Sequence, residues 1–87
     1  MARVFIPAQW RDLTNGVAEV DTAGATLGEI VAGLEARFPG IAERATVDGE
    51  IMPGLAASIG GVVTSRGLMA RVQPTSEIHF LPAIGGG

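Results

Sequence analysis

The first residues of the chain alternate between two kinds of side chain, which is the pattern of a β-strand. From Ala2 to Pro7 the sequence is rich in β-branched and aromatic residues, and it closes with a proline, which cannot continue a ladder of hydrogen bonds. Successive side chains on a strand point to opposite faces. We therefore expect Val4 and Ile6 on one face of this strand, and Arg3 and Phe5 on the other.

A second strand with the same alternation is predicted at Glu77–Leu81, after the turn residues Gln73-Pro74-Thr75-Ser76. The apolar face of this strand carries Ile78 and Phe80. The other face carries Glu77, His79 and Leu81.

Between these strands the hydrophobic spacing changes to that of a helix. Thr26 is followed three residues later by Glu29, a capping-box pattern in which each side chain accepts a backbone N–H of the first turn. Apolar residues at helical spacing then form one stripe, and Pro39-Gly40 ends the helix. The stripe consists of Leu27, Ile30, Val31, Leu34 and Phe38.

The remaining segments give weaker signals. The turn at Asp12–Gly16 leads into a strand at Val17–Asp21 that would pair back on the first strand, with Ala18 and Val20 facing inward. One helical turn is expected at Ile41–Arg44, followed by a loop. Further short strands are expected at Leu55–Ile59 and Val62–Thr64, joined by a Gly60-Gly61 turn, whereas Leu68–Val72 fits no single element.

One main helix cannot cover both faces of a sheet. The predicted fold class is therefore α+β, with two layers and the helix on one face of the sheet only.

Composition then narrows the classes of function. The length of 87 residues allows one small domain, and 47% hydrophobic residues are enough for a packed core. The chain has no cysteine and one histidine, which argues against a disulfide framework, a metal site and a catalytic triad. Six scattered arginines, no lysine and a net charge of −3 argue against nucleic acid as a partner. Without a membrane-spanning run or a secretory signal, we expect a soluble, cytoplasmic domain with no membrane partner.

The sequence ends in three consecutive glycines, Gly85, Gly86 and Gly87. Glycine buries no side chain and loses more backbone freedom on ordering than any other residue, so this tail is not expected to stabilise the fold. The six residues from Pro82 can reach about 20 Å. Such a tail can enter a narrow channel and present its carboxylate to another protein's active site. A frayed end without function is the alternative.

The order of elements and the terminal glycines resemble the ubiquitin-like β-grasp sulfur carriers. These include the small subunit of molybdopterin synthase, the thiamine-pathway carrier and the cysteine-biosynthesis carriers. The resemblance covers nearly the whole chain, and its most specific part is Ile78–Gly87. Three weaker markers are Val4–Pro7, Thr26–Glu29 and Phe38–Gly40.

The resemblance implies a β-grasp fold with a mixed sheet, in which the first and last strands are parallel neighbours at the centre. It implies one domain over residues 1–84 and a tail over residues 85–87. The turns at Ile59-Gly60-Gly61 and Gln73–Ser76 differ from those common in the family, and Gly85 replaces a residue such as Ala or Ser. The two turn differences affect the expected register more than the fold.

The resemblance also implies the chemistry. In this family an adenylating enzyme of the ubiquitin-activating type converts the terminal carboxylate, here that of Gly87, to an acyl-adenylate. Sulfur then replaces AMP and gives a thiocarboxylate. ATP and Mg²⁺ are accordingly ligands of the partner, and this chain is expected to bind no metal or cofactor and to be a carrier, not an enzyme. A downstream synthase is the expected second partner and accepts the sulfur.

Strand parity suggests where these partners dock. If the apolar faces of the first and last strands contact the helix, a second cluster lies on the uncovered face and is predicted to bind a partner. This cluster consists of Phe5, Pro7, His79 and Leu81, and Ile84 continues it. Loops or a second copy of the chain are alternative covers. A catalytic role for His79 is not expected.

Three other functions remain open from the sequence. The chain resembles cysteine-type carriers slightly more than the small subunit of molybdopterin synthase, through Ile6-Pro7 and the segment Phe38–Arg44. The same tail would serve a ubiquitin-like modifier that is joined to lysines of other proteins. The third alternative is a plain interaction module with a disposable tail.

Overall fold

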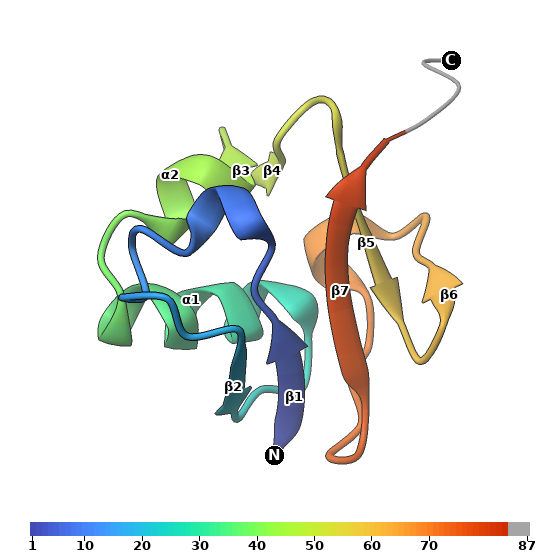
Figure 1. The fold of residues 1–87 in the computed structure, drawn as a ribbon. Helices are drawn as coiled ribbons and strands as arrows, with labels where there is room; N and C mark the ends of the chain where they lie inside the picture. Colours follow the sequence, from blue (N-terminus) through green and yellow to red (C-terminus); the bar gives the residue numbers. More distant parts are fainter. Residues whose placement is uncertain (84–87) are drawn as a thin grey trace.

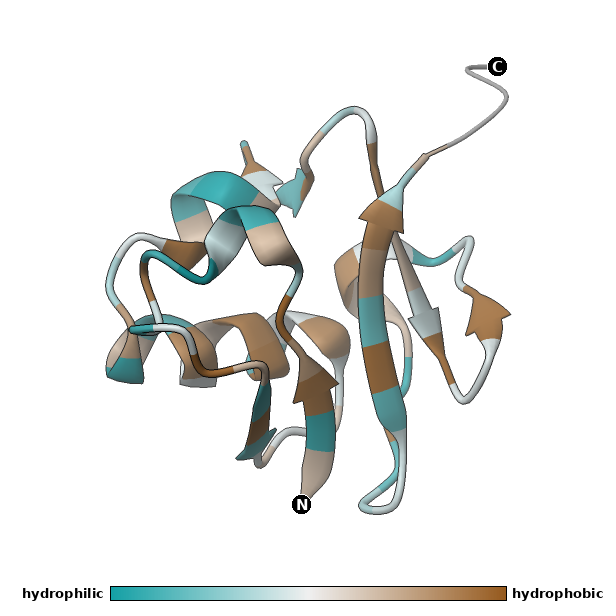
Figure 2. Ribbon diagram, in the orientation of Figure 1, coloured by the Kyte–Doolittle hydropathy of each residue, from teal (hydrophilic) through white to brown (hydrophobic). Residues whose placement is uncertain are grey.

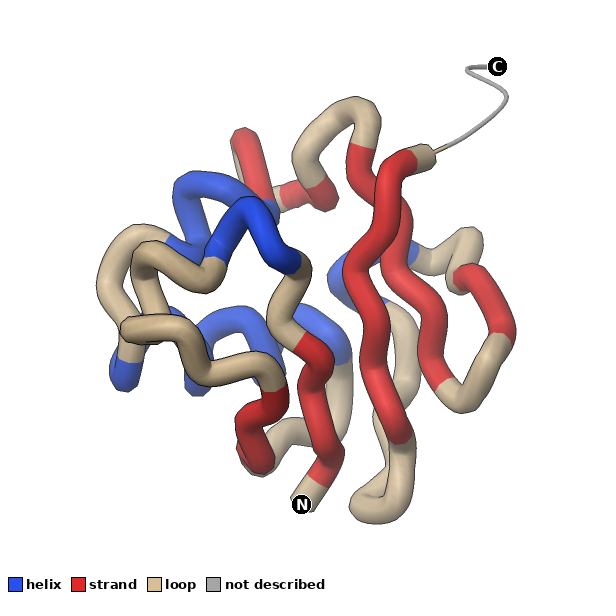
Figure 3. The backbone as a smooth tube through the Cα atoms, in the orientation of Figure 1, coloured by secondary structure: helices blue, strands red, loops and turns tan. Residues whose placement is uncertain are grey.

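The computed structural model describes residues 1–83, which form a five-stranded sheet packed against helices (Figures 1 and 3). The strands of the sheet are β1 (Ala2–Phe5), β2 (Glu19–Thr22), β5 (Leu55–Ile59), β6 (Val62–Val63) and β7 (Glu77–Pro82). The helices are η1 (Ala8–Trp10), α1 (Leu27–Arg37), α2 (Ile41–Ala45) and η2 (Gly67–Met69). A separate small hairpin consists of β3 (Thr46–Val47) and β4 (Glu50–Ile51).

The strand order is β2-β1-β7-β5-β6. The first and last strands, β1 and β7, are parallel neighbours at the centre, and the other neighbours are antiparallel. This confirms the predicted mixed sheet and the central position of the terminal strands.

The core lies between the sheet and α1. The α1 residues Leu27, Ile30, Val31 and Leu34 are buried together with the apolar faces of β1 and β7 in one hydrophobic cluster. Phe38, the last residue of the predicted stripe, lies beyond α1 and packs against this cluster partly buried. Val4, Ile6 and Ile78 are at most 1% exposed, and Phe80 is 7% exposed. The prediction that these residues face the helix is therefore confirmed.

The predicted antiparallel pairing of β2 with β1 is confirmed, but the connection between the two strands differs from the prediction. β1 ends at Phe5 and not at Pro7, and η1 follows it. Thr14 is buried, and its hydroxyl donates to the carbonyl of Val17 at 2.8 Å, which holds Val17 in the turn. As a result β2 begins at Glu19, and Ala18 is exposed instead of facing inward.

The ends of α1 follow the predicted signals. The Thr26 hydroxyl accepts the N–H of Glu29 at 3.2 Å, and the Glu29 carboxylate accepts the N–H of Ala25 at 3.0 Å. The second bond reaches one residue beyond the capping box proper, in which the N-cap N–H is the donor. At the other end Gly40 takes a positive φ of 109°, which favours glycine and lets the chain turn into α2.

Glu35 holds the start of α2 in place. Its carboxylate accepts the N–H of Gly40 at 3.0 Å and the N–H of Ala42 at 2.8 Å, and Gly40 has no side chain that could cap the helix. An anionic acceptor at a helix N-terminus satisfies free N–H groups and complements the helix dipole. Glu35 therefore joins α1 to α2.

We expect Glu35→Ala to lower the free energy of unfolding by about 1–2 kcal/mol, because two partly buried N–H groups lose their acceptor. Glu35→Gln, which keeps a neutral acceptor, should cost less. Urea unfolding monitored by circular dichroism measures both. Glu50→Ala is the matched control, since Glu50 is an exposed glutamate of β4. An equal effect of both alanine variants would contradict this role.

An ion pair joins α2 to the segment after η1. The Arg44 guanidinium donates to both carboxylate oxygens of Asp12, at 2.7 and 2.9 Å, and also to the carbonyl of Gln9. The hydrogen bond from Arg44 lowers the pKa of Asp12 below its ordinary value of 3.8. The same bond raises the pKa of Arg44.

Stability should therefore depend on pH through Asp12. Because the folded pKa lies below the unfolded one, the unfolded state binds more protons, and stability rises with pH in this window. The contribution is present above pH 3.8 and is lost as the pH falls through the lowered pKa of Asp12. NMR titration of the Asp12 carboxyl should show this pKa rising toward its ordinary value in Arg44→Gln and staying low in the control Arg66→Gln. An unchanged pKa in Arg44→Gln would contradict the assignment.

Candidate functional site

The sheet face opposite α1 carries most of the predicted docking residues. Residues directly opposite each other on paired strands share a face. Phe5 is opposite His79, His79 is opposite Ser58, and Leu81 is opposite Ala56. We refer to these five residues, Phe5, Ala56, Ser58, His79 and Leu81, as the open face.

Phe5 and His79 form a stacked pair at the centre of this face. Their ring centroids are 4.2 Å apart and the rings are inclined by only 5°. Phe5 is half-buried, whereas His79 is exposed. Stacked rings with few rotatable bonds offer a partner a flat surface at a low cost in conformational entropy.

The two ends of the open face differ in charge. At the N-terminal end of β1, Nη1 of Arg3 lies 3.6 Å from Oε1 of Glu19, and Nε of Arg3 lies 3.4 Å from Oδ1 of Asp21. The residue opposite Arg3 on β7 is Glu77. With three acids and one base, this end has a net negative charge. β7 runs from there toward Leu81 and Pro82, and the alternation of polar and apolar residues along it is visible in Figure 2. The open face therefore has an acidic end and an apolar end.

The apolar end of the open face lies beside Pro82 and Ala83. The N–H of Ala83 donates to the carbonyl of Gly54 at 2.9 Å, which fixes the last described residue beside β5. A groove of about 340 Å³ adjoins it. Its lining consists of Ala56, Val63, Leu81, Pro82 and Ala83. An apolar surface thus leads from the stacked rings to the position from which the C-terminal residues depart.

The structure brings together Phe5, His79 and Leu81 of the predicted docking cluster. Pro7 is half-buried beyond the end of β1, so the register does not place it, and its role stays a prediction. The other predicted site residues, Ile84, Gly85, Gly86 and Gly87, lie outside the described residues, as does the predicted boundary between domain and tail.

Ala56 and Ser58 of the open face, and Val63 of the groove, are additions that the sequence reasoning missed. The strand at Leu55–Ile59 was predicted, but which of its residues lie on the open face is decided by its register against β7. That register joins residues 19 to 27 positions apart and has no local signature.

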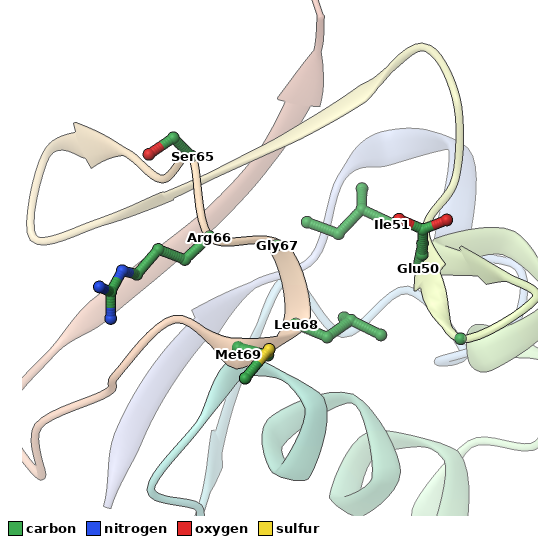
Figure 4. Close-up of a pocket in the computed structure, with 8 residues that line it drawn as sticks. Glu50, Ile51, Ser65, Arg66, Gly67, Leu68 and Met69 are labelled. Atoms are coloured by element: carbon green, nitrogen blue, oxygen red, sulfur yellow. The ribbon is translucent and has the colours of Figure 1, made fainter.

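A second hollow lies between β4 and η2, with a volume of about 350 Å³ (Figure 4). Ile51 and Leu68 extend into it from opposite sides, whereas Arg66 extends away from Glu50. This hollow contains none of the predicted site residues.

Within residues 1–83, no group of three or more His, Cys, Asp or Glu side chains is placed to hold a metal ion. The helices of the same region are all too short or too polar to span a bilayer.

Comparison with known proteins places these features in a family context. The model of the ThiS family matches residues 4–87. The sulfur carrier protein CysO of Mycobacterium tuberculosis (strain ATCC 25618 / H37Rv) is 32% identical over 89 residues, covering 97% of this chain and 96% of that protein.

Solved structures agree with this match. A chain in the crystal structure of the Amycolatopsis orientalis BexX/CysO complex is similar with a TM-score of 0.91 and 30% identity, over the full length of both chains. The crystal structure of Mycobacterium tuberculosis CysO gives a TM-score of 0.88 and 28% identity, over 97% of this chain and 100% of that one. These neighbours confirm the β-grasp fold. Small archaeal modifier protein 1 from Methanosarcina acetivorans shares the fold, with a TM-score of 0.79 and 20% identity, over 99% of this chain and 95% of that one.

Proposed function

This chain belongs to the ThiS family of ubiquitin-like sulfur carriers, and on that basis we propose that the Gly87 carboxylate is the atom group that carries the sulfur. The carboxylate is first adenylated and then converted to a thiocarboxylate. The thiocarboxylate delivers sulfur in a biosynthetic pathway of the cysteine type, and the similarity to CysO supports this pathway over the molybdopterin alternative.

The chemistry follows from the poor reactivity of a free carboxylate. An acyl transfer from it would have to expel an oxide ion. Attack of a carboxylate oxygen on the α-phosphorus of ATP expels pyrophosphate and gives an acyl-adenylate, from which AMP can leave. A sulfur nucleophile then attacks the acyl carbon, the C–O bond to AMP breaks, and the C–S bond of the thiocarboxylate forms. The absence of cysteine fits this scheme, since the sulfur is held at the C-terminus and not on a side chain.

The observation that carries the proposal is the position of the apolar end of the open face next to Ala83. Only four residues separate Ala83 from the end of the chain. A partner that covers Leu81 and the neighbouring groove therefore contacts this chain within about 14 Å of the terminal carboxylate, the reach of the four residues after Ala83. Docking and delivery of the carboxylate are coupled by this short distance.

The proposed chemistry requires two protein partners for this chain. One is an adenylating enzyme of the ubiquitin-activating type, which supplies the binding sites for ATP and Mg²⁺. The other is a synthase that accepts the sulfur. The crystallised BexX/CysO complex shows that a similar carrier associates with another protein. We place all three proteins in the cytoplasm.

Mass spectrometry tests the proposal. The full chain is incubated with a cognate activating enzyme, ATP and sulfide, and one oxygen should be replaced by sulfur, which adds about 16 Da. Fragmentation should place the added mass on Gly87. An unchanged mass, with an activating enzyme that converts a known carrier in parallel, would overturn the proposal.

A further inference from the structure

A separate surface lies at the outer edge of the sheet, where β6 is the last strand. Val62 and Val63 of this strand are 69% and 57% exposed, which is unusual for two neighbouring valines. A groove of about 370 Å³ runs along them. Its lining includes Ile59, Val62, Val63, Thr64, Arg66 and Arg71. It meets the groove beside the open face at Val63.

The backbone of β6 has an outward-facing amide. Thr64 donates its N–H to the carbonyl of Ala57 at 2.9 Å, and the next pair in the register is Ser58 with Val63. Hydrogen-bonded and non-hydrogen-bonded pairs alternate in an antiparallel ladder. The N–H and C=O of Val63 therefore point away from β5, toward the side where another strand could pair.

The two arginines in this groove differ from the other four. Arg3, Arg11, Arg37 and Arg44 each donate a side-chain hydrogen bond within the fold. Within residues 1–83, Arg66 and Arg71 make no such bond and no ion pair. They are also the only charged residues that line the groove.

A pair of uncommitted guanidinium groups on a protein of net charge −3 is suited to carboxylates, which they bind through two parallel N–H bonds each. We propose that the β6 edge binds an extended acidic segment of another protein. The segment adds to the sheet as a further strand through Val63, and its carboxylates contact Arg66 and Arg71. A second copy of this chain fits less well, because β6 is only two residues long and a symmetric pair would bring like charges to one edge.

This inference does not depend on sulfur transfer. The probe is an acetylated and amidated peptide of sequence Asp-Glu-Val-Ile-Glu-Asp, and its control carries Lys at every acidic position. Titration of the ¹⁵N-labelled full chain at low salt should shift the amides of Val62, Val63 and Thr64 with the acidic peptide only.

The double variant R66A/R71A should bind the acidic peptide at least about tenfold more weakly. The variant R3A/R37A removes the same charge from other parts of the surface and should bind it within about twofold of the unmodified chain. Three results would each overturn the proposal: equal binding of the two peptides, shifts centred on Phe5 and His79, or sedimentation of the chain as a dimer that the peptide does not disrupt.

Discussion

Removal of Gly86 and Gly87 is expected to reduce formation of the acyl-adenylate by more than about 10³-fold while the midpoint of thermal unfolding stays unchanged. The deletion withdraws the terminal carboxylate by two residues, about 7 Å, whereas reacting atoms must come within about 3–3.5 Å of each other. Glycine has no side chain to bury, so the deletion is not expected to remove core packing. Release of pyrophosphate measures the first property, and differential scanning calorimetry measures the second.

The matched control for this deletion removes Met1, which is 76% exposed at the other end of the chain and leaves the carboxylate in place. The variant Gly86→Val separates the effect of tail length from the effect of tail width, because it keeps the length of the tail but adds a branched side chain. If the terminal residues pass through a narrow channel in the partner, this variant should also react slowly. A truncated chain that still forms the adenylate would show that Gly87 is not the reactive residue.

The elements predicted best from the sequence are those whose signals are local. Helix α1 begins at the predicted cap, because Thr26 and Glu29 act within one turn, and it ends before Pro39-Gly40. The faces of β7 also follow from strict alternation, with Ile78 buried and His79 exposed. Such features need no information from distant parts of the chain.

The elements that were missed depend on distant contacts. The segment Leu68–Val72 fitted no single element because it is held by the start of α1: the N–H of Leu27 donates to the carbonyl of Ala70, and the N–H of Val72 donates to that of Ala25. The hairpin of β3 and β4 has only two residues in each strand, too few for a periodic pattern. These segments line the hollow between β4 and η2, and Ala70 and Arg71 also line the groove along β6.

The residues of the open face were predicted in part for the same reason. Parity within one strand gave Phe5, His79 and Leu81, but only the pairing of β1 with β7 places the two rings in contact. No local signal in the sequence indicates this pairing, which was expected from the resemblance to β-grasp carriers. Ala56 completes the face through a register that the sequence alone does not encode locally.

Leu81→Glu is the second change for which we expect a large effect, a rise of about 10- to 100-fold in the KM of the activating enzyme for this chain. Leu81 lies at the apolar end of the open face and lines the groove beside Ala83. A carboxylate there would be buried without a partner in an apolar interface, which costs several kcal/mol unless the interface rearranges. Phe5→Ala, which removes one ring of the stacked pair, should raise the same KM by a smaller factor.

The value of kcat should fall much less than KM rises, because the carboxylate of Gly87 is unchanged once the complex has formed. Val47→Glu is the matched control: Val47 is 41% exposed on β3, outside the open face, and the same change of side chain there should leave KM within about twofold. Circular dichroism of all variants checks that the fold is intact. If Leu81→Glu and Val47→Glu had equal KM values, the partner would have to bind elsewhere, and proximity to Ala83 would no longer explain how the carboxylate reaches the active site.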